Sequence, residues 1–219
     1  SIQNDTSATF TTTNLANGDK VVVVLTSGSC VVVSDTITMI VNPLPIPTAG
    51  SNSPICAGDS LKLTSFGGIS YAWTGPNSYS SSAQNPTFLH ASASLSGTYI
   101  VTVTAENGCS AMDSIAVLVH PLPIPSVSSN SPICAGGFLS LTSSGGISYA
   151  WTGPNNFSSV TQNLGFLNAS TLLSGTYTVK VTNANGCTAA DSTVVAVNAL
   201  PTPTAGSNSP ICAGNTLHL

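Results

Sequence analysis

The stretch from Gly67 to Asn77, which reads GGISYAWTGPN, decides the fold because the same eleven residues return unchanged at 145–155. The two copies are 78 residues apart. Flanking motifs recur with the same period: PLPIP at 43–47 and 121–125, and SNSPICAG at 51–58, 129–136 and 207–214. Repetition at a fixed period is typical of a tandem array built from one structural unit.

Each unit shows the two-residue hydrophobic period of a β-strand. Tyr99, Val101 and Val103 alternate with Ile100, Thr102 and Thr104, and in the second unit Lys180 stands in the polar set and marks it as facing solvent. Asn-Gly pairs at 107–108 and 185–186 lie between alternating runs and predict hairpin turns. No stretch has a capped run with helical spacing. The sequence therefore predicts an all-β protein.

Several marks of an immunoglobulin-like sandwich occur in each unit. Cys56, Trp73, the SGTY stretch at 96–99 and Cys109 resemble the cysteines, the core tryptophan of strand C and the tyrosine corner of strand F. One feature departs from that pattern, because Val101 occupies the place of the second cysteine. Cys109 follows the Asn-Gly turn instead. A bridge to Cys109 is therefore expected near one end of the sandwich.

The longer phrases resemble a particular group of proteins. ICAGDSLKLT, YAWTGPNSYSSSAQNPTF and SGTYIVTVTAENGC are similar to Ig-like and PKD-like repeats of large Bacteroidota surface proteins of the gliding and adhesin type. The resemblance implies type IX export and tandem immunoglobulin-like β-sandwiches arranged as a rod. It divides the chain into the C-terminal half of a distinct Ig-like domain (1–42), repeat 1 (43–120), repeat 2 (121–198) and the N-terminal strands of a further repeat (199–219).

The low content of charged residues limits the kinds of molecule that the chain could bind. Charged residues make up 5% of the chain, with three Lys and no Arg, whereas ordinary soluble domains carry about a quarter. Nucleic acid is excluded as a partner, because binding phosphates requires clustered Lys and Arg. No apolar run reaches the length of a membrane span, and the most hydrophobic one, Val21–Leu25, has the length of a strand. Any export signal is expected outside these 219 residues.

The six cysteines suggest structural disulfides. Cys56 and Cys109 are separated by 53 residues, as are Cys134 and Cys187, so each repeat holds one such pair. Zinc sites need closely spaced ligand pairs such as CxxC or HxxxH, and the chain has neither. We therefore predict disulfides Cys56–Cys109 and Cys134–Cys187, no metal and no cofactor. Disulfides persist in oxidising compartments, which places the protein outside the cytoplasm.

Two cysteines remain, Cys30 and Cys212. One interpretation is that the sequence is a window of a longer chain, in which each would pair with a cysteine outside this range. The alternative is an intermolecular bond, Cys212 of one molecule with Cys30 of the next, with strands donated head to tail. The first is favoured, since the two terminal segments together lack a strand C with its tryptophan.

No constellation of residues predicts catalysis. His90 and His120 become Asn168 and Asn198 in repeat 2, and His218 aligns with Lys62 and Ser140. A triad or metal site that used one of these histidines would exist in only one copy of a near-duplicate unit. Ten residues are expected in the core: Leu61, Leu63, Trp73, Tyr99 and Val101, and in repeat 2 Leu139, Leu141, Trp151, Tyr177 and Val179. Tyr79 and Phe157 are expected in a loop as exposed contacts. The chain is predicted not to be an enzyme.

Two functional hypotheses remain. The first is a structural or adhesive segment of a secreted bacterial cell-surface protein or fibre, whose partners are neighbouring repeats and possible surface glycans. PLPIP favours extended geometry, so successive repeats are expected to form a semi-rigid rod. The second is a carbohydrate- or ligand-binding accessory module of a large secreted enzyme, for which aromatic platforms would be required.

A modification pattern adds one hypothesis. The resemblance implies O-glycosylation of Ser or Thr that follows Asp and precedes a small or aliphatic residue. Four of the six Asp residues are followed by such a match, and the hydroxyl side chain has outward strand parity each time. The candidate sites are Thr36, Ser60, Ser114 and Ser192.

Overall fold

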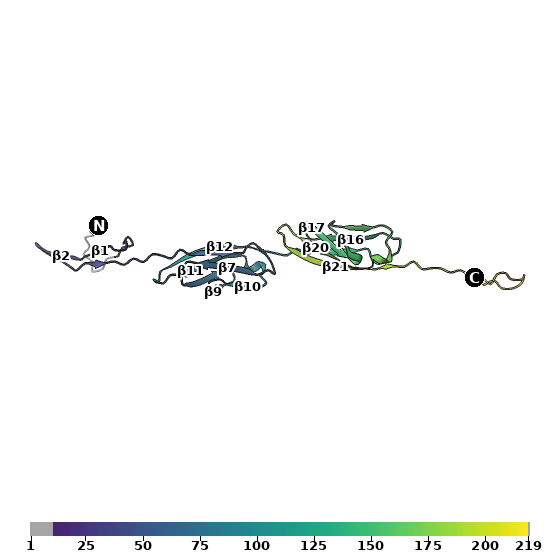
Figure 1. Cartoon of the computed structure of the whole chain (residues 1–219), viewed down its shortest axis with the longest axis horizontal. Helices are drawn as coiled ribbons and strands as arrows, with labels where there is room; N and C mark the ends of the chain where they lie inside the picture. Colours follow the sequence, from purple (N-terminus) through teal and green to yellow (C-terminus); the bar gives the residue numbers. More distant parts are fainter. Residues whose placement is uncertain (1–10, 219) are drawn as a thin grey trace. The chain divides into compact units, whose positions relative to one another are not determined.

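The computed structural model describes residues 11–218. The chain divides into two compact units between Val119 and His120, one for each complete repeat, and each repeat is described by itself. Residues 11–218 contain β-strands and short 3₁₀ turns but no α-helix. Figure 1 shows the strands of repeat 1, such as β7, β11 and β12, and those of repeat 2, such as β16, β20 and β21.

Repeat 1 is a two-layer β-sandwich. Its elements are β5 (Thr48–Ser51), β6 (Ile55–Cys56), β7 (Leu61–Phe66), β8 (Ser70–Gly75), β9 (Tyr79–Ser81), β10 (Thr87–Phe88), η1 (Ala93–Leu95), β11 (Gly97–Thr104), β12 (Ser110–Val117) and β13 (Val119–His120). One sheet has the strand order β10-β7-β5 and the other β12-β11-β8-β9. A small additional pair joins β6 to β13.

Repeat 2 reproduces this arrangement. Its elements are β14 (Ser126–Ser129), β15 (Ile133–Cys134), β16 (Leu139–Ser144), β17 (Ser148–Gly153), η2 (Pro154–Asn156), β18 (Phe157–Ser159), β19 (Leu164–Phe166), η3 (Thr171–Leu173), β20 (Gly175–Thr182), β21 (Thr188–Val195) and β22 (Val197–Asn198). The sheets have the orders β14-β16-β19 and β18-β17-β20-β21, and β15 pairs with β22 in parallel.

The predicted alternation forms the core of each sandwich. Along β11 the side chains of Tyr99, Val101 and Val103 are buried, while those between them face outward. Val101 lies opposite Trp73 in the β8–β11 ladder, which places the tryptophan at the centre of its sheet. The predicted core residues are all confirmed as buried: Leu61, Leu63, Trp73, Tyr99 and Val101, and in repeat 2 Leu139, Leu141, Trp151, Tyr177 and Val179.

The large core side chains also satisfy their polar atoms, as buried groups require. Tyr99 donates from its hydroxyl to the carbonyl oxygen of Leu95 at 3.0 Å, and Tyr177 donates to Leu173 at 3.1 Å, which confirms the tyrosine corner in both repeats. The indole N–H of Trp73 donates to the carbonyl oxygen of Gln84. Burial raises the pKa of both corner tyrosines above the usual 10.0, and Tyr79 adds to the rise at Tyr99.

Residues 11–42 form two short antiparallel ladders. β1 (Lys20–Val21) pairs with β4 (Ile37–Thr38), and β2 (Val24–Ser27) pairs with β3 (Cys30–Val33). Cys30 is the first residue of β3 and follows the turn directly. Cys109 has a similar place, between a turn and the first residue of β12. The strands β2 and β3 are exposed along their whole length. That this segment is half of a distinct Ig-like domain stays a prediction, and its residues 1–10 lie outside the described part.

Residues 199–218 contain a loop but no strand. The loop has the same internal hydrogen bonds as in the complete repeats: Asn208 donates to Thr216 and accepts from the backbone of His218, as Asn52 does with Ser60 and Lys62. All residues from 199 to 218 are exposed. Local sequence is therefore enough to form this loop, whereas strands need a partner strand that supplies their hydrogen bonds.

Candidate functional site: the two ends of each repeat

The linker between repeats is bound to the repeat that follows it. In repeat 1 the side-chain amide of Asn107 donates to the carbonyl oxygen of Pro43 at 3.1 Å. In repeat 2 the amide of Asn183 donates to Pro121 at 3.0 Å. Both Asn residues lie in the hairpin turn that precedes the last long strand. We call the end of the sandwich that carries this turn and the bound linker the linker end.

A second contact holds the linker at the same end. Gly67 opens the turn between β7 and β8 with a φ of +111°, a conformation that favours glycine. A Cβ at Gly67 would collide with the carbonyl oxygen of Ile46, and one at Gly145 would collide with that of Ile124. The Gly-Gly stretch therefore forms both a turn and the surface against which the linker packs.

At the opposite end of the sandwich, which we call the far end, the chain leaves each repeat. In repeat 1, β6 pairs with β13 there, and the backbone N–H of Ile55 donates to Leu118 at 3.2 Å. In repeat 2 the pair is β15 with β22, and Cys134 lies opposite Asn198. The far end thus carries the first cysteine of each repeat.

The predicted disulfides Cys56–Cys109 and Cys134–Cys187 are not formed. Cys109 and Cys134 are free thiols, while Cys56 and Cys187 are each disulfide-bonded. The reason is distance. Cys109 lies at the linker end, where its thiol points to the carbonyl oxygen of Asn42, and Cys56 lies at the far end. The eight residues of β12 separate the two ends by about 23 Å, and a disulfide requires Cα atoms within about 7 Å.

The equal spacing of the cysteines misled the prediction because it follows from the repeat itself. If every unit has one cysteine at the far end and another at the linker end, the number of residues between the two is the same in each unit. The spacing therefore shows that the positions recur, and does not show which thiols are close. Cys30 and Cys212 are both free and exposed, so whether they pair outside this range or between molecules stays a prediction.

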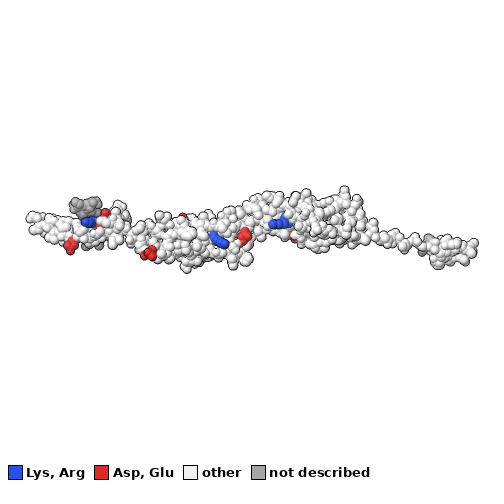
Figure 2. Space-filling model, in the orientation of Figure 1, with Lys and Arg blue, Asp and Glu red and all other residues white. Residues whose placement is uncertain are grey.

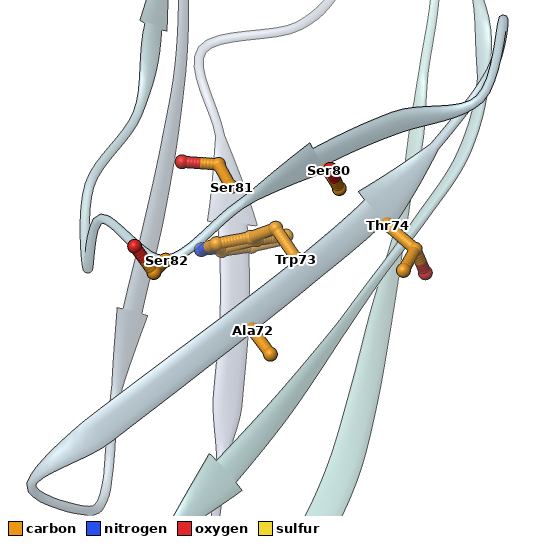
Figure 3. Close-up of a pocket in the computed structure, with 6 residues that line it drawn as sticks. All are labelled: Ala72, Trp73, Thr74, Ser80, Ser81 and Ser82. Atoms are coloured by element: carbon orange, nitrogen blue, oxygen red, sulfur yellow. The ribbon is translucent and has the colours of Figure 1, made fainter.

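A hollow of the described surface lies beside the core tryptophan of repeat 1. Figure 3 shows it between β8 and β9, lined by Ala72, Trp73, Thr74, Ser80, Ser81 and Ser82, and its volume is about 580 Å³. The lining supplies hydroxyl groups and no charge. Trp73 itself is 1% exposed, so its ring faces are covered by the core and offer no platform on which a sugar could stack.

Tyr79 and Phe157 were expected in a loop as exposed contacts, and this is wrong. Tyr79 begins β9, is half-buried, and packs against Phe88 and Tyr99 with ring centroids 4.6 and 5.8 Å away. Phe157 makes the equivalent contacts in repeat 2. The error came from the Ser-rich surroundings, which read as a loop, although the short edge strand turns this one ring onto the core.

The three histidines occupy a left-handed backbone position, the end of a strand and an exposed loop. His90 is exposed and has a φ of +54°, and the equivalent Asn168 has +52°. Asn and His are both enriched in this left-handed region, which explains why they exchange at this position. His120 ends β13, and His218 lies in the exposed loop of residues 199–218. In residues 11–218 no three His, Cys, Asp or Glu side chains gather as metal ligands would.

The predicted glycosylation hydroxyls are mostly accessible. Thr36, Ser114 and Ser192 are exposed, and Ser60 is half-buried. Asp113 and Asp191, which precede Ser114 and Ser192, have a structural role that the sequence did not reveal. Asp113 accepts a hydrogen bond from the backbone N–H of Ala49 at 2.8 Å, and Asp191 accepts one from Val127 at 3.2 Å. These carboxylates join the last long strand of each repeat to its first, which gives the Asp-Ser pattern a second explanation.

The outer surface carries very few charges. Figure 2 shows isolated Lys, Asp and Glu side chains on a face that is otherwise uncharged. No helix in the described part is long and apolar enough to cross a membrane. Both repeats have a bound linker at one end and a cysteine at each end. The sequence did not reveal that Asn107 and Asn183 bind the linker, or that Asp113 and Asp191 join two strands.

The chain was compared with protein families, curated proteins and solved structures. No protein-family model and no curated protein matches the chain. Among solved structures it is similar to three N-terminal domains of the bacteriophage RB49 outer capsid protein Hoc, with 19% identity, 70% of this chain and 59% of that one covered, and a TM-score of 0.39. It therefore spans less than two thirds of that structure.

Two further structures are similar. Murine CEACAM1b is 13% identical, with 71% of this chain and 100% of that chain covered and a TM-score of 0.37. The N-terminal eight Ig domains of DSCAM are 14% identical, with 76% and 26% covered and a TM-score of 0.47. The strand orders, the central tryptophan and the tyrosine corner of this chain identify its two complete repeats as immunoglobulin-like β-sandwiches.

Proposed function

We propose that this chain is a structural and adhesive stalk segment of a secreted bacterial surface protein, in which repeats space a binding region away from the cell. The observation that carries the proposal is the bound linker. His120 ends the last strand of repeat 1, and the next residue, Pro121, is already bound through its carbonyl oxygen to Asn183 of repeat 2. No free spacer separates the two, so the junction is expected to bend little.

The surface chemistry supports the same role. A stalk outside the cell needs solubility without binding nucleic acid or membranes, and a surface of hydroxyl and amide groups provides this. The disulfide-bonded state of Cys56 and Cys187 supports an oxidising compartment. The resemblance to Bacteroidota surface repeats suggests the source and a type IX export route, and the duplicated immunoglobulin-like architecture supports a non-enzymatic role.

Glycans on Thr36, Ser60, Ser114 and Ser192 are part of this proposal. The exposure of three of the four hydroxyls supports it, and glycans would solubilise a chain with little charge. Intact-mass measurement of protein from its native source tests this point. Added hexose-type mass at these residues would support it, and the bare polypeptide mass would end it.

Small-angle X-ray scattering tests the stalk. We expect the parent chain to give one well-defined maximum dimension, and a variant with a six-residue Gly-Ser spacer inserted after His120 to give a broad distribution of shapes. The matched control carries the same six residues appended after Leu219. If the parent and the spacer variant scatter alike apart from added length, the junction is already flexible and the stalk proposal is wrong.

The alternative is a carbohydrate-binding accessory module, and the hydroxyl-lined hollow at Thr74 and Ser80–Ser82 is the feature that favours it. Binding to a glycan array that is lost in a Ser80→Ala/Ser82→Ala variant would establish this alternative. In repeat 2 Val160 stands in place of Ser82, so a binding site of this kind would belong to repeat 1 alone.

A further inference from the structure

We propose that Asn185 is a site of spontaneous covalent modification, in which its side-chain amide is lost by deamidation, and that the bound linker protects Asn107 from the same reaction. Both residues precede a glycine in the turn at the linker end of their own repeat. The chemistry is confined to that turn in each repeat, so it goes beyond the proposed function and does not rest on it.

An asparagine that precedes a glycine lies beside a backbone nitrogen that can act as a nucleophile. That nitrogen loses its proton and attacks Cγ of the asparagine, and the new C–N bond closes a succinimide ring. The bond from Cγ to Nδ2 breaks, and the side-chain nitrogen takes up the proton and leaves as ammonia. Water then opens the ring at either carbonyl and gives aspartate or isoaspartate. Glycine favours the attack because it has no Cβ to hinder the approach.

The side-chain amide of Asn107 is held at both of its polar atoms. Nδ2 donates to the carbonyl oxygen of Pro43 at 3.1 Å, and Oδ1 accepts from the backbone N–H of Cys109 at 3.0 Å. The attacking nitrogen belongs to Gly108, and its N–H donates to the carbonyl oxygen of Ala105 at 2.9 Å. The amide has to turn towards that nitrogen before the ring can close. Asn107 therefore reacts only after the turn and the linker have opened locally.

Asn185, the aligned residue of repeat 2, lacks both side-chain restraints. It is exposed, and its side-chain amide has no hydrogen-bond partner among residues 11–218. Its backbone N–H donates to Oδ1 of Asn183 at 3.0 Å, and the N–H of Gly186 donates to the carbonyl oxygen of Asn183 at 3.1 Å. Of the three hydrogen bonds that restrain the reaction at Asn107, only the one on the glycine nitrogen has an equivalent here.

The asparagine that binds the linker of repeat 2 is protected by its sequence position. Asn183 donates to the carbonyl oxygen of Pro121 at 3.0 Å and is followed by Ala184, whose Cβ hinders the approach of the backbone nitrogen. Loss of the amide at Asn185 therefore leaves that linker bound. In repeat 1 the residue that binds the linker is itself the one that precedes glycine. Its conversion to aspartate removes the donor for good, because the ammonia is lost.

Lysine-specific cleavage measures each site separately. The three lysines divide the chain into peptides 1–20, 21–62, 63–180 and 181–219, and the Asn-Gly pairs 17–18, 107–108 and 185–186 fall in three different peptides. The full chain is incubated at mildly alkaline pH, and mass spectrometry follows the replacement of the amide by a hydroxyl group in each peptide. In the folded protein we expect peptide 181–219 to convert at least about tenfold faster than peptide 63–180.

The same chain unfolded in urea is the matched control, because local sequence alone then sets the rates. Peptides 63–180 and 181–219 should convert at similar rates there, and Asn185→Gln should abolish conversion of 181–219 only. Equal rates in the folded protein would overturn the proposal, as would an unreactive peptide 181–219 in the folded state. A difference of the same size that persists in urea would also overturn it, since the linker would then not be the cause.

The modified protein also reports on the linker of repeat 2. The new carboxylate adds a negative charge, so ion exchange separates the chain modified at Asn185 alone, which peptide mapping identifies. Leu122 should keep a backbone order parameter of about 0.85 in this species, as in the parent. Loss of order at Leu122 would show that Asn185 holds the linker and would overturn that part of the proposal. The scattering experiment tests the stalk separately, because the reaction rates do not depend on how the repeats are arranged.

Discussion

The side-chain amide of Asn107 is hydrogen-bonded to the carbonyl oxygen of Pro43 across 64 residues of sequence. Repeat 2 makes the same clamp from a different position of the turn, because Asn183 binds Pro121 there and the residue aligned with Asn107 is Asn185. Each linker is thus bound by an asparagine side chain, although the asparagine occupies a different turn position in the two repeats. The linker is therefore part of the repeat that follows it.

Asn107→Asp should release the linker of repeat 1. The aspartate keeps the oxygen that accepts from the backbone of Cys109, but it cannot donate to Pro43. We expect the backbone order parameter of Leu44 to fall from about 0.85 towards 0.6 in NMR relaxation. In repeat 2, Asn183→Asp should do the same to Leu122, and Asn185→Asp should not. Equal loosening by Asn183→Asp and Asn185→Asp would contradict the clamp.

Trp73→Ala should destabilise repeat 1 by about 3–5 kcal/mol, because it empties the largest volume in the core and removes the indole hydrogen bond to Gln84. Urea unfolding followed by circular dichroism measures the loss. Ile69→Ala is the control in the turn that precedes the same strand, since Ile69 is 66% exposed, and it should stay within about 0.5 kcal/mol of the parent. Equal effects of the two substitutions would contradict the assigned core.

Ser65 and Ser143 occupy the same buried position and should respond differently to alanine. The hydroxyl of Ser143 donates to Gln162 at 2.7 Å, while that of Ser65 is buried without a hydrogen-bond partner among the described residues. Ser143→Ala should cost about 1 kcal/mol, and Ser65→Ala should be neutral or stabilising. Differential unfolding of the two single variants checks the sign, and a larger loss at Ser65 would show that its hydroxyl is paired.

The raised pKa values of Tyr99 and Tyr177 predict that the protein loses stability at high pH. Their folded pKa is raised above 10.0 because burial disfavours the phenolate. The unfolded chain therefore releases these protons first, so the contribution of the two tyrosines to stability is fully present below pH 10 and falls as pH rises above it. Tyr99→Phe/Tyr177→Phe should be less stable at pH 7 but show a shallower fall between pH 10 and 11. Parallel curves for parent and variant would contradict the assignment.

His90 should be replaceable by Asn without effect and not by Val. Its φ of +54° is a left-handed conformation that costs a β-branched side chain about 1–2 kcal/mol, whereas Asn168 occupies the same conformation in repeat 2. Thermal unfolding of His90→Asn and His90→Val measures the difference. If His90→Asn alone abolished a measurable activity or binding event, the histidine would have a chemical role that its surroundings do not suggest.

Much of this architecture followed from sequence because its causes are local. Alternation along 99–103 placed Tyr99 and Val101 inside, since successive side chains of a strand point to opposite faces. The SNSPICAG loop forms its Asn208 hydrogen bonds even where no strand accompanies it. Repetition of the motif set the number and the class of the complete domains.

Contacts between residues distant in sequence were decided only by the tertiary structure. The sequence around Tyr79 is typical of a loop, but Tyr79 lies in the edge strand β9 and its ring packs against Phe88. Cys56 and Cys109 looked like partners because their spacing recurs, but spacing in a repeat measures the period and not distance. The length of β12 keeps them at opposite ends of the sandwich, because an extended strand rises about 3.3 Å with every residue.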